Sequence, residues 1–524
     1  MTPSHSFAPA LHLVHASSTI SVVSIALATV LFFWVTGRIF YRRHNLPYPP
    51  GPPPKDFISG NARELSDSKL WFPMTEWAAI YGPIMHFRSF NKHMIVLNTV
   101  DDAIEIMEKR SNNYSDRPYI PMIDMIGWTF ATGLKPYGPE WHAHRRFMQQ
   151  TFKATASLQY RPIQTEKVND MLYGLLETPE DFMAHIKTLS AAIIMSAMYG
   201  YKVAPKDDYF TELAEAGMAA ISNASYPGAA VVNVLPILRY LPAWFPGAGF
   251  HRVAKIALDT VTRMQDVPYK YVQDNMAAGT ASPSVVTGLI ESCKTDAEHK
   301  LLKEVAATGY VAGADTTTAT LSTFVIAMAM YPDVQKKAQD ELDRVIGQDR
   351  LVNFDDENSL PYIQAICREV FRWRPVLPLG SFHAAVSEDI YRGYYIPAGT
   401  TIVANVWSMT RDPIKYKNPE EFIPDRYFAE ENRLNSDDMN YTFGFGRRIC
   451  PGRHLASATT WLGVATILSA FDIRPPKDAS GNDIHLNVEY TGGLISHPVP
   501  FDCVITPRSD GMKQLIVELK NSSL

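Results

Sequence analysis

The ten residues FGFGRRICPG, positions 443–452, constrain this chain more than any other segment. They place Cys450 directly before Pro451 and an apolar run with helical spacing, so we expect the cysteine to lie at a helix start. Free N–H groups and the helix dipole favour an anion there. A helix start and nearby cations lower the pKa of a thiol, and the thiolate is the form that binds metals. The position is therefore typical of a metal ligand.

The usual alternative for Cys450 is a buried structural cysteine. It would leave unexplained two neighbouring cations, Arg447 and Arg448, and three glycines that could let the backbone pass close to a large flat ligand, Gly444, Gly446 and Gly452. The four cysteines of the chain are far apart and form no CxxC pair. This spacing argues against a structural zinc site and a disulfide framework, and it leaves Cys450 available to another group.

A second unusual segment, AATGYVAGADTTTA, lies inside a long helix that we predict at about residues 302–330. Each of its interior glycines costs about 1 kcal/mol relative to alanine, which suggests a helix shaped for something close to its backbone. Small side chains at Ala312 and Gly313 would open a notch there, and Asp315 with Thr316 would supply protons. The alternative is a surface kink with a solvated aspartate, which the apolar character of the helix on most sides disfavours.

Two weaker patterns place polar side chains on shared helix faces. In EVFR, Glu369 and Arg372 stand three residues apart and can pair, and Arg426 of the later FIPDRY segment could complete a structural ion network. In WHAHRR, Trp141 and Arg145 stand four residues apart and present an indole N–H and a guanidinium together, which suits bound carboxylates. Taken alone, both patterns are also typical of surface helices with solvated charges.

An uncharged run of nineteen residues, TISVVSIALATVLFFWVTG at positions 19–37, lies near the N-terminus. As a helix it would span about 28 Å, close to the ~30 Å hydrocarbon core of a bilayer. The arginines that follow predict an uncleaved anchor with the rest of the chain on the cytoplasmic side. The alternative, a cleaved signal peptide, lacks a basic region before the run and a nearby small-residue cleavage site. The segment LPYPPGPPP, positions 46–54, then predicts a stiff spacer.

The remaining sequence has the composition of a globular protein, and its net charge of -5 argues against nucleic-acid binding. Helical periodicity dominates and β signals are short, so we predict a mainly α fold with a small β region. Residues 213–250 read as two helices joined by an apolar connection that covers a pocket or dips into a bilayer. No later linker is visible. The expected parts are a membrane anchor with its flank (1–45), a proline-rich hinge (46–54) and one catalytic domain (55–524).

Together these segments resemble the cytochrome P450 family of heme-thiolate monooxygenases. The family's heme-binding pattern Phe-x-x-Gly-x-Arg-x-Cys-x-Gly is matched by Phe443, Gly446, Arg448, Cys450 and Gly452, and this pattern is highly specific. The weaker patterns follow in the family's order, so the resemblance covers essentially the whole chain. The anchor and hinge resemble the microsomal branch. The segments YSDRP, YGPEWHAHRR and SHPVPFDC resemble fungal, particularly mushroom, members of secondary metabolism, including O-methylsterigmatocystin oxidoreductase-like enzymes.

The resemblance implies a cytochrome P450 fold preceded by a single N-terminal transmembrane helix, with heme b as the cofactor and Cys450 as the axial thiolate ligand of its iron. It implies that Asp315 and Thr316 supply protons during oxygen activation. It also implies heme binding by Trp141, Arg145, His383, Phe443, Arg448 and Gly452, and a structural ion network of Glu369, Arg372 and Arg426. One departure concerns His383, because Phe382 stands where many relatives have proline.

Family topology points to pocket segments of apolar and aromatic composition, which include Ile120, Ile123, Ala312, Leu377 and Leu494. We therefore expect a neutral lipophilic substrate such as a fungal terpenoid. The alternative is an aromatic, indole or polyketide metabolite, and an amine could be bound by Asp116 or Asp124, although loop carboxylates are more often solvated.

The resemblance further implies O2 as co-substrate and electrons from NADPH, delivered by a separate NADPH–cytochrome P450 reductase, with cytochrome b5 as a candidate second donor. The expected location is the endoplasmic reticulum membrane, single-pass, with the catalytic domain in the cytosol and in contact with lipid. Two other classes stay open at this point. One is a non-oxygenating heme-thiolate isomerase or dehydratase, against which the presence of both Asp315 and Thr316 argues, and the other is a non-catalytic heme-binding protein.

Overall fold

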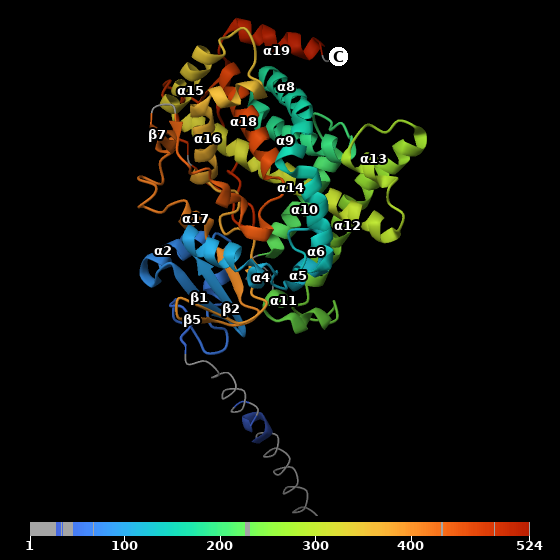
Figure 1. Cartoon of the computed structure of the whole chain (residues 1–524), viewed down its shortest axis with the longest axis vertical. Coiled ribbons are helices and arrows are strands. Elements are labelled where there is room, and N and C mark those ends of the chain that lie inside the picture. Colours follow the sequence, from blue (N-terminus) through green and yellow to red (C-terminus); the bar gives the residue numbers. More distant parts are fainter. Residues whose placement is uncertain are drawn as a thin grey trace, which may run out of the picture. The chain divides into compact units, whose positions relative to one another are not determined.

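The structure, a computed structural model, describes residues 28–32, 34, 46–66, 68–225, 231–430, 433–486 and 488–522. Internal contacts divide the chain into two units, one formed by residues 1–49 and 388–396 and the other by residues 50–387 and 397–524. The second unit is mostly helical and carries small sheets (Figure 1). The prediction of a mainly α fold with a small β region is confirmed.

The longer helices are α2 (Trp71–Tyr81), α6 (Pro139–Phe152), α8 (Arg161–Glu177), α9 (Phe182–Tyr199), α10 (Tyr209–Ser225), α12 (Phe250–Ala278), α14 (Asp296–Met330), α15 (Pro332–Val345), α16 (Pro361–Trp373), α18 (Arg453–Ala470) and α19 (Asp510–Ser522). Short α helices are α3 (Val100–Ala103), α4 (Ser111–Tyr114), α5 (Pro121–Met125), α7 (Ala154–Ser157), α11 (Val231–Val234), α13 (Val285–Ile290) and α17 (Val406–Met409). The strands are β1 (Ile84–Ser89), β2 (Lys92–Leu97), β3 (His383–Ala384), β4 (Asp389–Tyr391), β5 (Tyr394–Ile396), β6 (Thr401–Ala404), β7 (Phe428–Glu430), β8 (Arg433–Leu434), β9 (Phe471–Arg474) and β10 (Val504–Pro507).

Helix α14 organises the helical part, because it packs against α9, α10, α16 and α18 (Figure 1). It begins at Asp296, earlier than the predicted start, since Thr295 and Glu298 form a capping box that satisfies the first free N–H groups. It ends at Met330, just before Pro332, as predicted. Most of its side chains are buried, which excludes the alternative of a surface helix.

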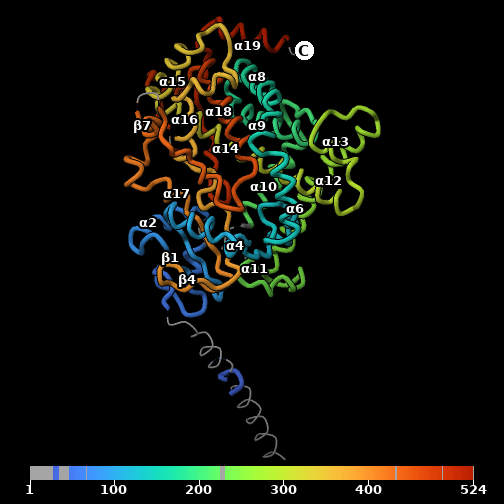
Figure 2. The backbone as a smooth tube through the Cα atoms, in the orientation of Figure 1, coloured from blue at the N-terminus to red at the C-terminus, as the bar shows by residue number. Residues whose placement is uncertain are grey.

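The main sheet joins segments that lie far apart in the sequence, in the order β1-β2-β6-β3. Strand β2 pairs in parallel with β6, so the orange segment that contains β6 lies beside the blue segment of β1 and β2 in Figure 2. At the sheet edge, β3 is antiparallel to β6, and the N–H of Ala384 donates to the carbonyl oxygen of Asp116 at 2.8 Å. The sheet therefore fixes residues 376–384 against the segment around Asp116.

Residues 213–250 contain the end of α10, the short helix α11, the 3-10 helix η6 (Pro236–Tyr240) and the start of α12. The prediction of two helices with an apolar connection is confirmed for the part that the structure describes, which omits residues 226–230. Ile237, Tyr240 and Trp244 of this connection are each more than two thirds exposed. We call residues 231–245 the exposed apolar segment.

The first unit contains the hairpin β4–β5, whose two-residue turn places Arg392 and Gly393 at positive φ, as a type I′ turn requires. Of the predicted anchor, residues 28–32 and 34 are helical and the rest lies outside the described residues. Within the described part of the chain, the segment Pro179–Tyr199 is apolar and long enough to cross a membrane, but most of it is buried inside the protein. It is a core helix, and the predicted anchor is left as a prediction.

Candidate active site

Cys450 lies in the turn that leads into α18. Its backbone N–H donates to the carbonyl oxygen of Phe443 at 2.8 Å, and its own carbonyl oxygen accepts from the Arg453 guanidinium at 3.2 Å. The helix begins at Arg453 with Gly452 as its N-cap, so Cys450 lies two residues before the cap. Pro451 forms the turn that joins the thiol to the helix start.

The thiol of Cys450 is not acidified by its surroundings. Burial raises its pKa above the ordinary value, and this outweighs the opposing effects of the Gly452 N–H and of the Arg145 and Arg453 guanidiniums. The helix start and nearby cations do lower this pKa, as expected, but burial has the larger effect. A buried thiol loses its proton when a bound metal ion supplies the compensating charge, so the site is built for a ligand and not for a free nucleophile.

A cavity of about 990 Å³ opens beside this thiol, and we call it the cysteine cavity. Segments from α6, α9, α14 and α18 line it, and its lining includes Trp141, Ala312, Thr316, Cys450 and Gly452. The predicted iron ligand and the notch on α14 therefore face one space.

Three guanidiniums line the cysteine cavity and are held by backbone carbonyl oxygens. Arg145 donates to Ile449 at 2.6 Å, Arg448 donates to Ser115 at 2.8 Å and to Lys135 at 2.9 Å, and Arg117 donates to Gly133 at 2.6 Å. The Arg448 guanidinium also lies over the Trp141 ring, 4.4 Å from its centroid. These contacts orient the three cations without neutralising them.

The lining of the cysteine cavity does not balance the charge of these arginines. Among the described residues that line the cysteine cavity there is no carboxylate. Burial lowers the pKa of Arg448 to about 10, with Asp116 opposing the shift, and burial together with Arg448 lowers the pKa of Arg117 well below its usual value. Buried cations require an anionic partner. A flat group with two carboxylates and a thiolate-binding metal, as heme b is, fits this donor set.

Arg117 was not predicted as a site residue. Its position in YSDRP gives no signal for a ligand, because its contacts with Gly133 and with the carbonyl oxygens of Ser381 and Phe382 come from segments distant in sequence. Only the fold brings this guanidinium beside Arg448.

Two residues predicted to bind heme do not line the cysteine cavity. Phe443 packs its ring edge-on against Phe371, with centroids 5.2 Å apart, and supplies the carbonyl oxygen that holds the Cys450 N–H. His383 is buried, with its Nδ1 2.6 Å from the carbonyl oxygen of Tyr114, and burial followed by the Arg117 charge lowers its pKa well below the usual value. Both support residues of the cavity wall, and their role in heme binding is left as a prediction.

The sequence predicted that the glycines of this loop let a ligand approach the backbone, and the structure supports this for one of the two glycines described here. Gly446 has a φ of +52°, and a Cβ there would lie 2.5 Å from the carbonyl oxygen of Met107, so backbone packing requires it. Gly452 does line the cysteine cavity, and a Cβ there would meet the Cys450 sulfur at 3.9 Å. Close approach to a ligand is therefore an explanation for Gly452 and not for Gly446.

On α14, Ala312, Gly313, Thr316 and Thr317 line the cysteine cavity, whereas Asp315 does not. The Thr316 hydroxyl donates to the carbonyl oxygen of Ala312 at 2.7 Å. The Asp315 carboxylate lies on the flank of the helix, 3.2 Å from Nε2 of His497. The two residues predicted to supply protons are thus adjacent, and one of them faces the cavity.

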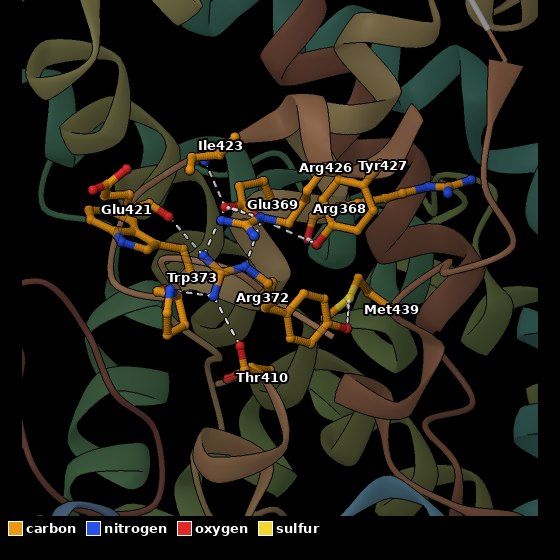
Figure 3. Close-up of polar contacts among 12 residues, drawn as sticks. Arg368, Glu369, Arg372, Trp373, Thr410, Glu421, Ile423, Arg426, Tyr427 and Met439 are labelled. Atoms are coloured by element: carbon orange, nitrogen blue, oxygen red, sulfur yellow. Dashed lines mark hydrogen bonds and ion pairs between the residues drawn. The ribbon is translucent and has the colours of Figure 1, made fainter. Parts of the chain in front are cut away.

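The structure brings Glu369, Arg372 and Arg426 together, as Figure 3 shows. Glu369 and Arg372 are completely buried and share two hydrogen bonds of 2.7 and 2.8 Å. Arg426 reaches Glu369 at 3.2 Å, and the N–H of Ile423 donates to the same carboxylate at 2.8 Å. Burial alone would lower the pKa of Arg372, but the bonds to Glu369 raise it above its usual value. This network fixes α16 to residues 410–427, far from any cavity chemistry.

A second cavity of about 1040 Å³ shares one lining residue, Arg117, with the cysteine cavity. We call it the loop cavity, because residues 117–136, 379–382 and 493–494 supply most of its wall. Of the predicted pocket residues, Ile120, Ile123 and Leu494 line the loop cavity and Ala312 lines the cysteine cavity, whereas Leu377 lines neither. Leu377 packs partly buried against the core.

Comparison with known proteins agrees with this site. A cytochrome P450 family model matches residues 49–503. A cytochrome P450 monooxygenase of Armillaria gallica is 39% identical over 506 residues, covering 95% of this chain and 99% of the relative. The cytochrome P450 monooxygenase COX1 of Coprinopsis cinerea is 38% identical over 94% of this chain and 98% of its own. The tryptamine 4-monooxygenase of Psilocybe cyanescens is 36% identical over 93% of this chain and 97% of its own.

A mostly helical fold with a half-buried cysteine before a helix start, facing a cavity lined by cations, is typical of the heme-thiolate class of proteins. The chain belongs to the cytochrome P450 family and is a monooxygenase. The family implies a heme whose iron is bound by a thiolate.

Proposed function

We propose that this monooxygenase hydroxylates or otherwise oxidises a neutral lipophilic metabolite of fungal secondary metabolism, such as a terpenoid, with O2 and with electrons from NADPH through a cytochrome P450 reductase. The observation that carries the proposal is the loop cavity, whose lining is mainly apolar and which shares the lining residue Arg117 with the cysteine cavity. A lipophilic molecule in the loop cavity would lie next to the cysteine cavity, where the oxidation would take place.

In this proposal Cys450 ligates the iron, and Arg117, Arg145 and Arg448 hold the two carboxylates of heme b, with Trp141 stacked on one of the guanidiniums. The bound heme supplies the activation of O2 and the oxidation itself. The protein excludes water, orients the substrate and supplies protons. The chain's remaining task is therefore proton supply from α14.

Thr316 is suited to hold a proton at the cavity wall. Its hydroxyl donates to the Ala312 carbonyl oxygen, so its oxygen can accept a further hydrogen bond from the cavity side. The small side chain of Ala312 leaves the space beside it open. Asp315, one position earlier, lies within reach of solvent and can replace a proton that Thr316 gives up.

Both carboxylates near the loop cavity already accept hydrogen bonds from the protein. Asp124 lines the loop cavity, and its Oδ2 accepts from Arg239 at 2.7 Å. Oδ1 of Asp116 accepts from the backbone N–H groups of Arg117 and Tyr137, both at 2.8 Å. A cationic substrate would have to share these carboxylates with donors of the protein, which favours a neutral substrate.

The alternative substrate class is an aromatic or indole metabolite. It is supported by the relative named tryptamine 4-monooxygenase, which is 36% identical. We rank it second because the protein already supplies donors to Asp116 and Asp124.

We also propose that the chain is a single-pass protein of the endoplasmic reticulum membrane, with residues 1–45 as its anchor, 46–54 as its hinge and the catalytic domain in the cytosol. The exposed apolar segment would rest on the same membrane, since Ile237, Tyr240 and Trp244 are 71%, 77% and 80% exposed. Arg447, which is exposed beside the thiol turn, and Arg453 would meet an acidic face of the reductase or of cytochrome b5.

The full chain should be expressed with a fungal cytochrome P450 reductase and supplied with neutral sesquiterpene hydrocarbons, such as humulene, caryophyllene and cadinene, and with tryptamine. The proposal predicts an NADPH-dependent oxygenated product from a hydrocarbon and none from tryptamine. Product from tryptamine alone would assign the alternative substrate class. Thr316→Ala should lower the amount of product per NADPH several-fold, and unchanged coupling would contradict the role given to α14.

A further inference from the structure

The Asp315 carboxylate is held by a residue to which the sequence assigned no role. Residue 315 is offset from Thr316 by about 100° around α14, so Asp315 faces the flank of the helix when Thr316 faces the cysteine cavity. On that flank the Nε2 of His497 lies 3.2 Å from Oδ1 of Asp315. The side chains of His497 and Asp315 are 29% and 23% exposed, so the pair lies between the helix and solvent.

His497 belongs to a closed loop, residues 489–499, which we call the C-terminal loop. The N–H of Val499 donates to the carbonyl oxygen of Glu489 at 2.9 Å. The N–H of Thr491 donates to the carbonyl oxygen of His497 at 2.8 Å. The His497 N–H returns a bond of 3.0 Å to the Thr491 hydroxyl. These bonds fix the backbone that carries the imidazole.

The C-terminal loop is attached to α14 at two places. The Tyr490 hydroxyl donates to the Thr323 hydroxyl at 3.2 Å, and His497 contacts Asp315 two turns earlier on the same helix. The N–H of Ser496 also donates to the carbonyl oxygen of Val376 at 2.9 Å. A rigid base of this kind determines where the Asp315 carboxylate can point.

The tip of the same loop lines the loop cavity through Gly493 and Leu494. The N–H of Gly493 donates to the Ser68 carbonyl oxygen at 2.8 Å, and that of Leu494 to the Ser222 hydroxyl at 3.3 Å. The C-terminal loop thus touches the proposed substrate space with its tip and the proposed proton donor with its base.

We propose that His497 is a positioning residue for Asp315, and that through it the C-terminal loop links occupation of the loop cavity to proton supply on α14. This rests on the proposed function, in which Asp315 and Thr316 supply protons. The imidazole acts by holding the carboxylate in one orientation, so a side chain that donates the same hydrogen bond can replace it.

The first test needs neither substrate nor turnover. Hydrogen exchange of the 489–499 backbone should be measured by mass spectrometry in the full-length heme-bound protein. His497→Ala and Asp315→Ala should both raise exchange in this loop several-fold, because each removes the same contact, and His497→Gln should stay near wild type. His485→Ala is the matched control, since it removes an exposed histidine outside this loop.

The second test is the amount of product formed per NADPH consumed, measured with the hydrocarbon that the wild-type protein oxidises in the experiment above. His497→Ala should lower this ratio several-fold while the dissociation constant of the hydrocarbon changes less than two-fold, and His497→Gln should recover most of it. Wild-type coupling in His497→Ala while Asp315→Asn is uncoupled would overturn the proposal and leave the proposed function standing. Wild-type coupling in Asp315→Asn would instead overturn the role of Asp315 itself.

Discussion

Arg117, Arg145 and Arg448 define the electrostatics of the site at the scale of single residues. Their N–H groups are directed by carbonyl oxygens, yet their charges meet no carboxylate among the described residues of the cavity lining. Burial raises the pKa of the Cys450 thiol in this environment. A ligand that brings both a metal ion and two carboxylates resolves the two problems together.

Glu369→Ala should destabilise the fold, because it leaves the fully buried Arg372 without its carboxylate. Breaking a buried pair in this way costs about 3–5 kcal/mol. The expected result is a much lower yield of heme-bound protein and an earlier urea midpoint. Glu421→Gln is the matched control, since Arg372 contacts only the carbonyl oxygen of that exposed residue. Equal stability of the two variants would show that the network is dispensable.

The structure predicts that the stability of the fold decreases in acid partly because of Glu304. Burial raises its pKa, but the bonds from His144 and Lys135 outweigh burial and lower it below the ordinary value of 4.5. A lowered folded-state pKa stabilises the fold above the ordinary value, and this contribution is lost as the pH falls below it. Glu304→Gln should therefore flatten the loss of unfolding free energy between about pH 5 and pH 3.

The measurement is urea unfolding at a series of pH values, with Glu180→Gln as an exposed control. Glu304→Gln should also be less stable at neutral pH, because it removes the ion pair of Glu304 with the buried Lys135, 3.0 Å away. Parallel pH curves for wild type and Glu304→Gln would contradict this account.

At the scale of elements, the contact between α14 and α9 sets the width of the cysteine cavity. A Cβ on Gly313 would lie 3.0 Å from Cγ1 of Ile194, so a larger residue at position 313 requires the Ile194 side chain to shift. Gly313→Val should lower the thermal midpoint and the heme content, since overpacking costs about 1–3 kcal/mol.

Ile194→Ala provides the matched test, because it removes the atoms that Gly313→Val would meet. Alone it should destabilise the core by leaving a cavity. Together the two substitutions should cost less than the sum of their separate effects, as expected for residues in direct contact. Additive effects would show that α14 is not held at this distance by Gly313.

Elements with strong local signals could be predicted from the sequence. The end of α14, the helix α16 and the apolar connection after α10 all follow from periodicity and proline positions. Helix boundaries that depend on capping differ from the predicted ones. The Thr295–Glu298 capping box places the start of α14 earlier, and the turn at Pro451 places the start of α18 at Arg453.

Site residues whose partners are distant in sequence could not be predicted. Arg117 reaches the site through carbonyl oxygens some 16 and 264 residues away, and His497 meets Asp315 only because the C-terminal loop folds back onto α14. The short signature around Cys450 identified the chemistry, since its residues act through local geometry. The charge balance of the cavity depends on the fold.

At the scale of the whole molecule, the proposed membrane location gives a prediction that distinguishes membrane binding by residues 1–45 from membrane binding by the exposed apolar segment. A chain lacking residues 1–45 should still bind vesicles of phosphatidylcholine and phosphatidylserine weakly, through the exposed apolar segment. Replacing Ile237 and Trp244 by serine should abolish this residual binding in a flotation assay. Ile414→Ser is the matched control, because Ile414 is 92% exposed outside that segment. Equal loss with Ile414→Ser would show non-specific adhesion.

The central claim is that Cys450 ligates a heme iron as a thiolate, and the spectrum of the reduced, carbon-monoxide-bound full-length protein tests it most directly. The wild-type protein should show the red-shifted Soret band of a thiolate heme, and Cys293→Ala should show the same band, because Cys293 does not line the cysteine cavity. Cys450→Ala should lack the band altogether. A normal band in Cys450→Ala would contradict the account.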